Sequence, residues 1–194
     1  MLFAAGGARL EERLVDTHRS ARGYIWLFVL GAVVALPLTL PVLPVSALAN
    51  GPWEGNINKD LSATVGWKPF VAQVAGIVAS LPPSQQAHVV IFTGDYGAAG
   101  AVDLYGARYG LPHAISGHNS YWSWGPAGAT DGATTIAVNL SRTYLDTMFG
   151  EVVPAGSVET PNDIWSEERG EPIWICRKQK VSWSSAWPAA KHYG

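Results

Sequence analysis

The stretch that decides the fold is residues 88–97, which read HVVIFTGDYG. Its first six residues form a short apolar run rich in β-branched side chains, as in a strand that is buried on both faces of a parallel sheet. The glycines and Asp95 that follow are typical of a turn, and a helix is predicted over residues 98–109, closed by Gly110. A strand followed at once by a helix is the first half of a βαβ unit.

The same alternation continues on both sides of this stretch. Before it, apolar residues at helical spacing predict a helix over residues 69–81. After it, Ser141 can cap a helix that Gly150 ends, and residues 117–126 (GHNSYWSWGP) form a polar loop. Four further strands are predicted, at residues 113–116, 134–138, 151–154 and 172–176. The pattern predicts an α/β fold, a Rossmann-like, mostly parallel α/β/α domain over residues 65–194.

A long uncharged segment precedes this domain. Residues 24–49 carry no charged side chain, and about 20 apolar residues cross a bilayer core, so a transmembrane helix is predicted there. The arginines before it place residues 1–23 in the cytoplasm, and residues 50–64 form a linker. We therefore expect a single-pass protein of the cell membrane, in contact with the lipid bilayer, whose C-terminal domain is extracytoplasmic. The alternative is a signal peptide cleaved after the small-x-small residues 47–49.

Composition narrows the function classes. The net charge is -2 and no basic stripe appears, which argues against a nucleic-acid partner. Cys176 is the one cysteine of the 194 residues, so an internal disulfide is excluded, and its apolar surroundings predict a buried thiol.

Polar residues follow two of the predicted strands, at residues 94–97 and 116–120. Ligands of parallel sheets bind beyond the carboxyl ends of the strands, so these two loops are the best candidate site. Asp95 and Asp103 are candidate acid/base groups, or else a turn residue and a helix-surface charge. His118, Asn119 and Ser120, followed by two aromatic residues, can recognise a sugar or a polar headgroup, or form a structural loop.

Other chemistry has less support. The loop at residues 93–100 (TGDYGAAG) matches neither G-x-G-x-x-G nor a P-loop, although amides at a helix start can hold a lipid-linked phosphate. His113 and His118 lack the spacing of a helical metal pair, so no metal and no other cofactor is expected. There is no G-x-S-x-G motif of a hydrolase.

Two motifs carry a family resemblance. Residues 95–106 (DYGAAGAVDLYG) and 116–122 (SGHNSYW), within a similarity over roughly residues 30–193, resemble the C-terminal part of bacterial family 39 glycosyltransferases. That family includes the aminoarabinose-transferase-like and protein-mannosyltransferase-like membrane enzymes. The resemblance implies that the loops assist recognition of the acceptor or lipid carrier. The candidate substrate-binding residues are Asp95, Tyr96, Asp103, Tyr105, His118, Asn119, Ser120 and Tyr121.

The resemblance also implies that catalysis and substrate recognition belong to different parts of the assembly. Enzymes of this family pass a sugar from a polyprenyl-phosphate carrier to an acceptor in the cell envelope, and their catalytic acids belong to an early loop that nothing in this chain matches. The usual Glu of the first motif is Ala98 here. We therefore expect a glycosyltransferase-associated domain that is not a complete enzyme, with a polyprenyl-phosphate sugar or glycan acceptor as ligand and a polytopic membrane subunit as partner. The alternative is a stand-alone, membrane-anchored module that binds carbohydrate or lipid.

Overall fold

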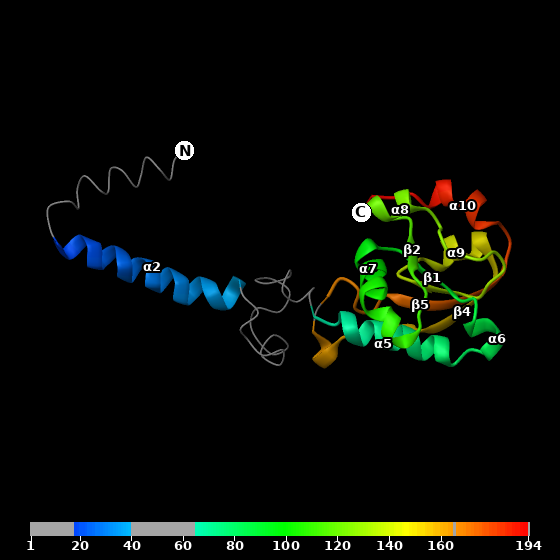
Figure 1. Ribbon diagram of the computed structural model, residues 1–194, viewed down its shortest axis with the longest axis horizontal. Coiled ribbons are helices and arrows are strands. Elements are labelled where there is room, and N and C mark those ends of the chain that lie inside the picture. The colour runs from blue at the N-terminus through cyan, green and yellow to red at the C-terminus, as the bar shows by residue number, and fades with distance from the viewer. Residues whose placement is uncertain (1–17, 40–64, 165, 194) are drawn as a thin grey trace. The chain divides into compact units, whose positions relative to one another are not determined.

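A computed structural model describes residues 18–39, 65–164 and 166–193 (Figure 1). Contacts divide the chain into two units, residues 1–61 and residues 62–194. The predicted linker at residues 50–64 and most of the predicted cytoplasmic segment lie outside the described residues.

The described part of the first unit is one helix, α2 (His18–Thr39). Across the described ranges, no helix has the length and apolar character needed to cross a membrane. The predicted transmembrane helix at residues 24–49 is therefore wrong, and so is the single-pass placement in the cell membrane with an extracytoplasmic domain. The helix starts early enough to include Arg19 and Arg22. Residues 40–49 lie outside the described ranges.

The described part of the second unit is built on a five-stranded sheet of order β2-β1-β3-β5-β4. The strands are β1 (Val90–Thr93), β2 (Ala114–Ser116), β3 (Thr135–Val138), β4 (Phe149–Ser157) and β5 (Pro172–Gln179). β1 lies between two parallel neighbours, and its Ile91 is in register with Ala114 of β2 and Ile136 of β3. All five predicted strands are confirmed, with starts that differ by up to two residues and ends that differ by up to three.

The predicted mostly parallel sheet is wrong, because the sheet is mixed. β5 is antiparallel to both of its neighbours, β3 and β4. The chain passes from β3 through a helix to β4 and leaves a gap of one strand. After Ser157 the chain reverses direction, and β5 lies between β3 and β4 and runs antiparallel to β4. Among its described residues the return connection, residues 158–171, contains no α-helix that could form a parallel crossover, and β5 pairs antiparallel with β4.

Helices cover both faces of the sheet. On one face, α5 (Trp67–Ala79) and α7 (Tyr96–Tyr105) pack against Ile91 and Ile136. On the other face, α9 (Arg142–Met148) and α10 (Trp183–Ala190) pack against Val90 and Phe92. Figure 1 shows α9 and α10 above the sheet and α5 below it. Consecutive residues of β1 thus enter opposite cores, as the two-residue period of a strand requires.

Local signals explain where the helices begin. The Asp95 carboxylate caps α7, the Ser141 hydroxyl caps α9, and Ser182 caps α10. The predicted cap at Ser141 is confirmed. Gly150 does not end that helix, because α9 stops at Met148 and Gly150 lies in β4. Four short elements complete the described domain: α6 (Pro83–Gln86), η1 (Gly106–Tyr109), α8 (Asn119–Trp124) and η2 (Pro161–Asp163). The helix α8 occupies much of the predicted polar loop at residues 117–126.

Candidate ligand-binding site

The topology places a crevice between the carboxyl ends of β1 and β3. The chain leaves β1 through α7, which covers one face of the sheet, and leaves β3 through α9, which covers the other. The two connections diverge, so the strand ends between them stay uncovered. This is the topological switch point, where ligands of open α/β sheets bind.

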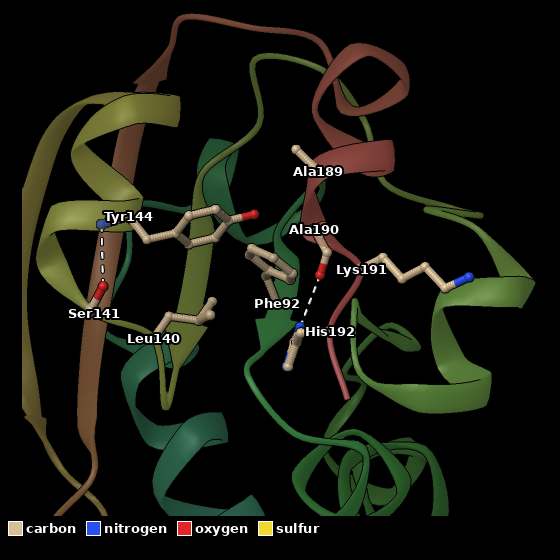
Figure 2. A pocket seen from close by; sticks show the side chains of 8 residues that line it. All are labelled: Phe92, Leu140, Ser141, Tyr144, Ala189, Ala190, Lys191 and His192. Atoms are coloured by element: carbon tan, nitrogen blue, oxygen red, sulfur yellow. Dashed lines mark hydrogen bonds between the residues drawn. The ribbon is translucent and has the colours of Figure 1, made fainter. Parts of the chain in front are cut away.

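A cavity of about 310 Å³ opens at this point. Phe92 of β1 and Leu140, at the end of β3, bound it on the sheet side. The remaining lining residues come from α9 and from the C-terminal segment: Ser141, Tyr144, Ala189, Ala190, Lys191 and His192. Figure 2 shows the Tyr144 ring and the Leu140 side chain pointing into the space between α9 and the C-terminal segment, whereas the Lys191 side chain points away from it. Burial raises the pKa of Tyr144, so its hydroxyl stays protonated and can donate.

Asp95 and Asn139 connect the two strand ends beside this cavity. The Asp95 carboxylate accepts the Ala98 amide N–H at 2.6 Å and the Asn139 side-chain amide at 3.3 Å. The strand ends approach so closely that a Cβ on Gly94 would lie 1.7 Å from the Asn139 carbonyl oxygen. Asn139 itself has a φ of 53°, a conformation that Asn tolerates better than most residues. Because a carboxylate already satisfies the start of α7, a ligand anion is disfavoured there.

The C-terminal segment lies against the loop after β2. The Asn119 N–H donates to the His192 carbonyl and the His192 N–H donates to the Gly117 carbonyl, both at 3.1 Å. A Cβ on Gly117 would lie 1.9 Å from the Ala190 carbonyl oxygen, so only glycine allows this approach. The chain end is thereby brought beside β1 and β2.

A group of aromatic rings stands at the edge of this contact. The His118 and His192 rings stack at 4.9 Å with an interplanar angle of 16°, and Tyr96 packs on His118 at 5.0 Å. Burial lowers the pKa of His118, the nearby His192 lowers it further, and the Asp95 carboxylate opposes both effects. These effects together disfavour a positive charge on His118.

Asp103 and Tyr121 form a separate structural contact. The Asp103 carboxylate accepts the Tyr121 hydroxyl at 3.0 Å and the Ala114 N–H at 2.8 Å, and the His113 ring lies 3.2 Å from it. Burial, followed by the Asp103 charge and hydrogen bond, raises the pKa of Tyr121 to about 12. These groups join α7, α8 and the start of β2, so their polar atoms are already used within the protein.

Comparison with protein-family models, with curated proteins and with solved structures gives no match. The arrangement of side chains is therefore the basis for assigning a function. Among the described residues, no group of three or more His, Cys, Asp or Glu side chains is placed to hold a metal ion.

The eight residues predicted from the sequence separate into three sets. Asp95, Tyr96 and His118 meet at the strand ends, and the backbone of Asn119 binds the C-terminal segment there. Asp103 and Tyr121 form the structural contact described above. Tyr105 lies under the cations of Lys68 and Arg108, and Ser120 is exposed. None of the eight is among the described residues that line the cavity.

The cavity residues that the sequence reading missed are chiefly Leu140, Tyr144 and His192. Leu140 comes two residues after a predicted strand, so the rule about carboxyl ends could have found it had it been applied to a third strand. Tyr144 lies one helical turn further on, where the signal is weaker. His192 belongs to the far end of the chain, and no local pattern connects it to β1.

Proposed function

We propose that the α/β domain binds a neutral sugar in the cavity between β1, β3 and the C-terminal segment. In this proposal it serves as a substrate-recognition domain of a glycosyltransferase that uses a lipid-linked sugar. The observation that carries the proposal is the cavity itself, which lies at the switch point and has an aromatic and apolar wall with a few polar groups at its rim.

The size and chemistry of the cavity support a ligand of monosaccharide size. Its volume of about 310 Å³ is at the lower end of the roughly 300–1,000 Å³ that is typical of ligand sites. The C–H face of a sugar ring can pack on the Tyr144 ring. Its hydroxyls can bond to the Ser141 and Tyr144 hydroxyls, which are polar groups of the kind that orient a ligand in an apolar pocket.

Charge supports an uncharged sugar rather than a phosphate. The carboxylate of Asp95 occupies the positive end of α7, which is where a phosphate would otherwise find free amides. The Lys191 ammonium group lies 4.2 Å from the centre of the Trp122 ring, and its side chain is directed away from the cavity (Figure 2). The phosphate of a lipid carrier would then be held elsewhere in the assembly.

The role is recognition rather than bond transfer. The described residues lining the cavity include no Asp or Glu, whereas glycosyl chemistry is generally carried by carboxylates. The resemblance of residues 95–106 and 116–122 to the C-terminal part of family 39 glycosyltransferases agrees with this role. In our proposal a separate polytopic membrane subunit provides the catalytic acids, and this domain positions the sugar or the glycan acceptor.

A second candidate is a carbohydrate-binding module that acts without a transferase. It is favoured by three exposed aromatic side chains, Tyr96, Trp124 and Tyr193, which are 54%, 64% and 68% exposed. Aromatic side chains are common in ligand sites, where their rings pack on the ligand. Tight binding of a glycan by the chain alone would favour this candidate. Weak binding that is strengthened by a co-purified transferase subunit would favour the first.

The test is calorimetric titration of the full chain with methyl glycosides of mannose, glucose, galactose and arabinose, and with the corresponding sugar 1-phosphates. We expect at least one neutral glycoside to bind more tightly than its phosphate. Tyr144→Ala should weaken this binding at least tenfold, which corresponds to about 1.4 kcal/mol.

The matched control is Tyr109→Ala, which removes a tyrosine that is 45% exposed in η1 and does not line the cavity. It should leave binding unchanged. If no glycoside binds, or if the two variants behave alike, the assignment of the cavity is wrong.

A further inference from the structure

The last described residues, Ala190–Tyr193, form what we term the C-terminal strap. Ala190, Lys191 and His192 line one side of the cavity. The strap is held to the loop after β2 by the two backbone hydrogen bonds that join His192 to Gly117 and Asn119. So few bonds make it a wall of the cavity that can loosen locally without unfolding the domain.

The His192 ring makes two further contacts, and both of its nitrogens face carbonyl oxygens. Its Nδ1 lies 2.9 Å from the Ala190 carbonyl oxygen, and its Nε2 lies 2.7 Å from the Gly94 carbonyl oxygen. Figure 2 shows the first of these contacts as a dashed line. Carbonyl oxygens only accept hydrogen bonds, and a neutral imidazole has a single N–H. Only the imidazolium form can donate to both oxygens, since either neutral tautomer turns a nitrogen lone pair towards one of them.

We propose that His192 is a protonation-dependent latch of the C-terminal strap. As an imidazolium it donates to Gly94 at the end of β1 and to Ala190 within the strap, and so closes the wall of the cavity. Loss of its proton leaves one N–H. The Nδ1–H tautomer gives up the bond to Gly94, and the Nε2–H tautomer turns the Nδ1 lone pair against the Ala190 carbonyl oxygen, so either tautomer loosens the strap. The claim that the latch regulates sugar binding rests on the proposed function. The claim that protonation of His192 holds the strap rests only on the two ring contacts.

The groups around the His192 ring do not favour a second positive charge on the histidine stacked against it. That histidine is His118, and its pKa is lowered, first by burial and then by His192. The Asp95 carboxylate, which also acts on His118, provides a negative charge at the end of β1. The other titratable groups that face this region are Tyr96 on α7, Tyr144 on α9, and Lys191 and Tyr193 on the strap itself.

The Lys191 side chain of the strap contacts two aromatic rings. The Lys191 ammonium group lies 4.2 Å from the Trp122 ring centre and 5.4 Å from that of Tyr193. Its positive charge is therefore stabilised by aromatic faces rather than by the carbonyls that His192 contacts.

The experiment follows the strap by NMR in the full chain without a ligand. Hydrogen exchange of the Asn119 and His192 amides is measured at pH 5 and pH 8 and divided by the exchange rate of an unstructured chain at the same pH. We expect this protection to fall about tenfold or more between pH 5 and pH 8. The ¹⁵N shifts of the His192 ring should report an imidazolium at pH 5. A ring that stays neutral at pH 5, or protection that does not change with pH, overturns the latch.

Two variants sharpen the result. His192→Gln can still donate through its amide but does not titrate, so its protection should be the same at both pH values. His88→Gln removes an exposed histidine that precedes β1, at the opposite end of the strand from the strap, and should keep the full pH dependence. A pH dependence that survives in His192→Gln overturns the proposal. If that variant does not fold, the ring shifts of the unsubstituted chain decide the matter.

Titration with the best methyl glycoside at pH 5 and pH 8 separates this inference from the proposed function. Tighter binding at pH 5, together with the change in protection, supports both. A change in protection with no sugar bound at either pH keeps the latch and rejects the proposed function. Sugar binding with protection that is independent of pH keeps the function and rejects the latch.

Discussion

Trp122 and Trp187 each donate their indole N–H to the backbone carbonyl of the other residue, at 3.0 and 2.9 Å. The two residues are 65 positions apart and lie on α8 and α10. Trp187 is buried in the core of the second face. This reciprocal pair fastens α10 beside the loop after β2, and thereby sets where the C-terminal strap begins.

The pair predicts a specific loss of stability. Trp187→Phe keeps an aromatic ring but removes the indole bond to the Trp122 carbonyl, which still accepts the Gly125 N–H, so we expect a loss of about 0.5–1.5 kcal/mol of unfolding free energy. Urea unfolding followed by circular dichroism measures this. Trp124→Phe alters a tryptophan that is 64% exposed and should cost less than about 0.5 kcal/mol. Equal effects of the two substitutions would show that the reciprocal bonds do not matter.

Gly94 predicts a steric effect at the strand ends. Gly94→Ala would place a methyl group 1.7 Å from the Asn139 carbonyl oxygen, so β1 and β3 would have to separate. We expect a loss of about 3 kcal/mol or more, or no folded protein at all. The matched control is Gly76→Ala on the exposed side of α5, where no heavy atom lies within 4 Å of the added methyl group. That change should stabilise the protein by roughly 0.5–1 kcal/mol, because alanine is the better helix former. Thermal unfolding of both variants tests the pair, and a well-folded Gly94→Ala protein would contradict the close approach.

Tyr121 predicts a dependence on alkaline pH. Its pKa of about 12 in the folded protein lies above the ordinary value near 10, so the folded state keeps a proton that the unfolded state releases. Stability from this group is fully present below pH 10 and is lost as the pH rises from 10 towards 12. Asp103→Asn removes the charge that is the second cause of the shift. The pKa should then fall but stay above 10, because burial is the larger cause. Tyrosine ¹³Cε chemical shifts followed from pH 9 to 12.5 measure this. An unchanged Tyr121 pKa in the variant would contradict the role of Asp103.

The burial of Cys176 predicts that its thiol is unreactive in the folded protein. It is buried in β5, and burial followed by the Asp146 charge raises its pKa to about 12. Thiolate is the reactive form, so iodoacetamide at pH 8 should not modify the folded chain within an hour. In urea, labelling should be complete, as measured by intact-protein mass spectrometry. Rapid labelling of the folded protein would mean that β5 opens readily or that the thiol is not buried.

Much of the domain can be predicted from local patterns. The run at residues 88–93 identifies β1, because only a buried strand has so short an uninterrupted apolar, β-branched stretch between turn signals. The caps at Asp95 and Ser141 are also local, since a side chain bonds to an amide three residues further along. The buried state of Cys176 follows from its apolar neighbours.

The errors come from properties that a local pattern does not contain. The direction of β5 depends on its position between β3 and β4. That position depends on how the connection from β3 to β4 places β4 in the sheet. The apolar run at residues 24–49 gives a length of chain but not where a helix begins and ends, and α2 includes two arginines. Residues 117–126 carry turn signals, yet α8 forms there because Tyr121 and Trp122 are held by distant partners, Asp103 and Trp187.

The sequence by itself determined the positions of the strands, the start of α9 at Ser141 and the two loops that meet at the ends of β1 and β2, because each depends on residues within a few positions of one another. Only the tertiary structure decided the candidate cavity and its latch. Phe92, Tyr144 and His192 come from three separate segments, and two close backbone approaches at Gly94 and Gly117 bring those segments together. Such contacts depend on how the whole chain packs, so no single stretch of sequence contains them.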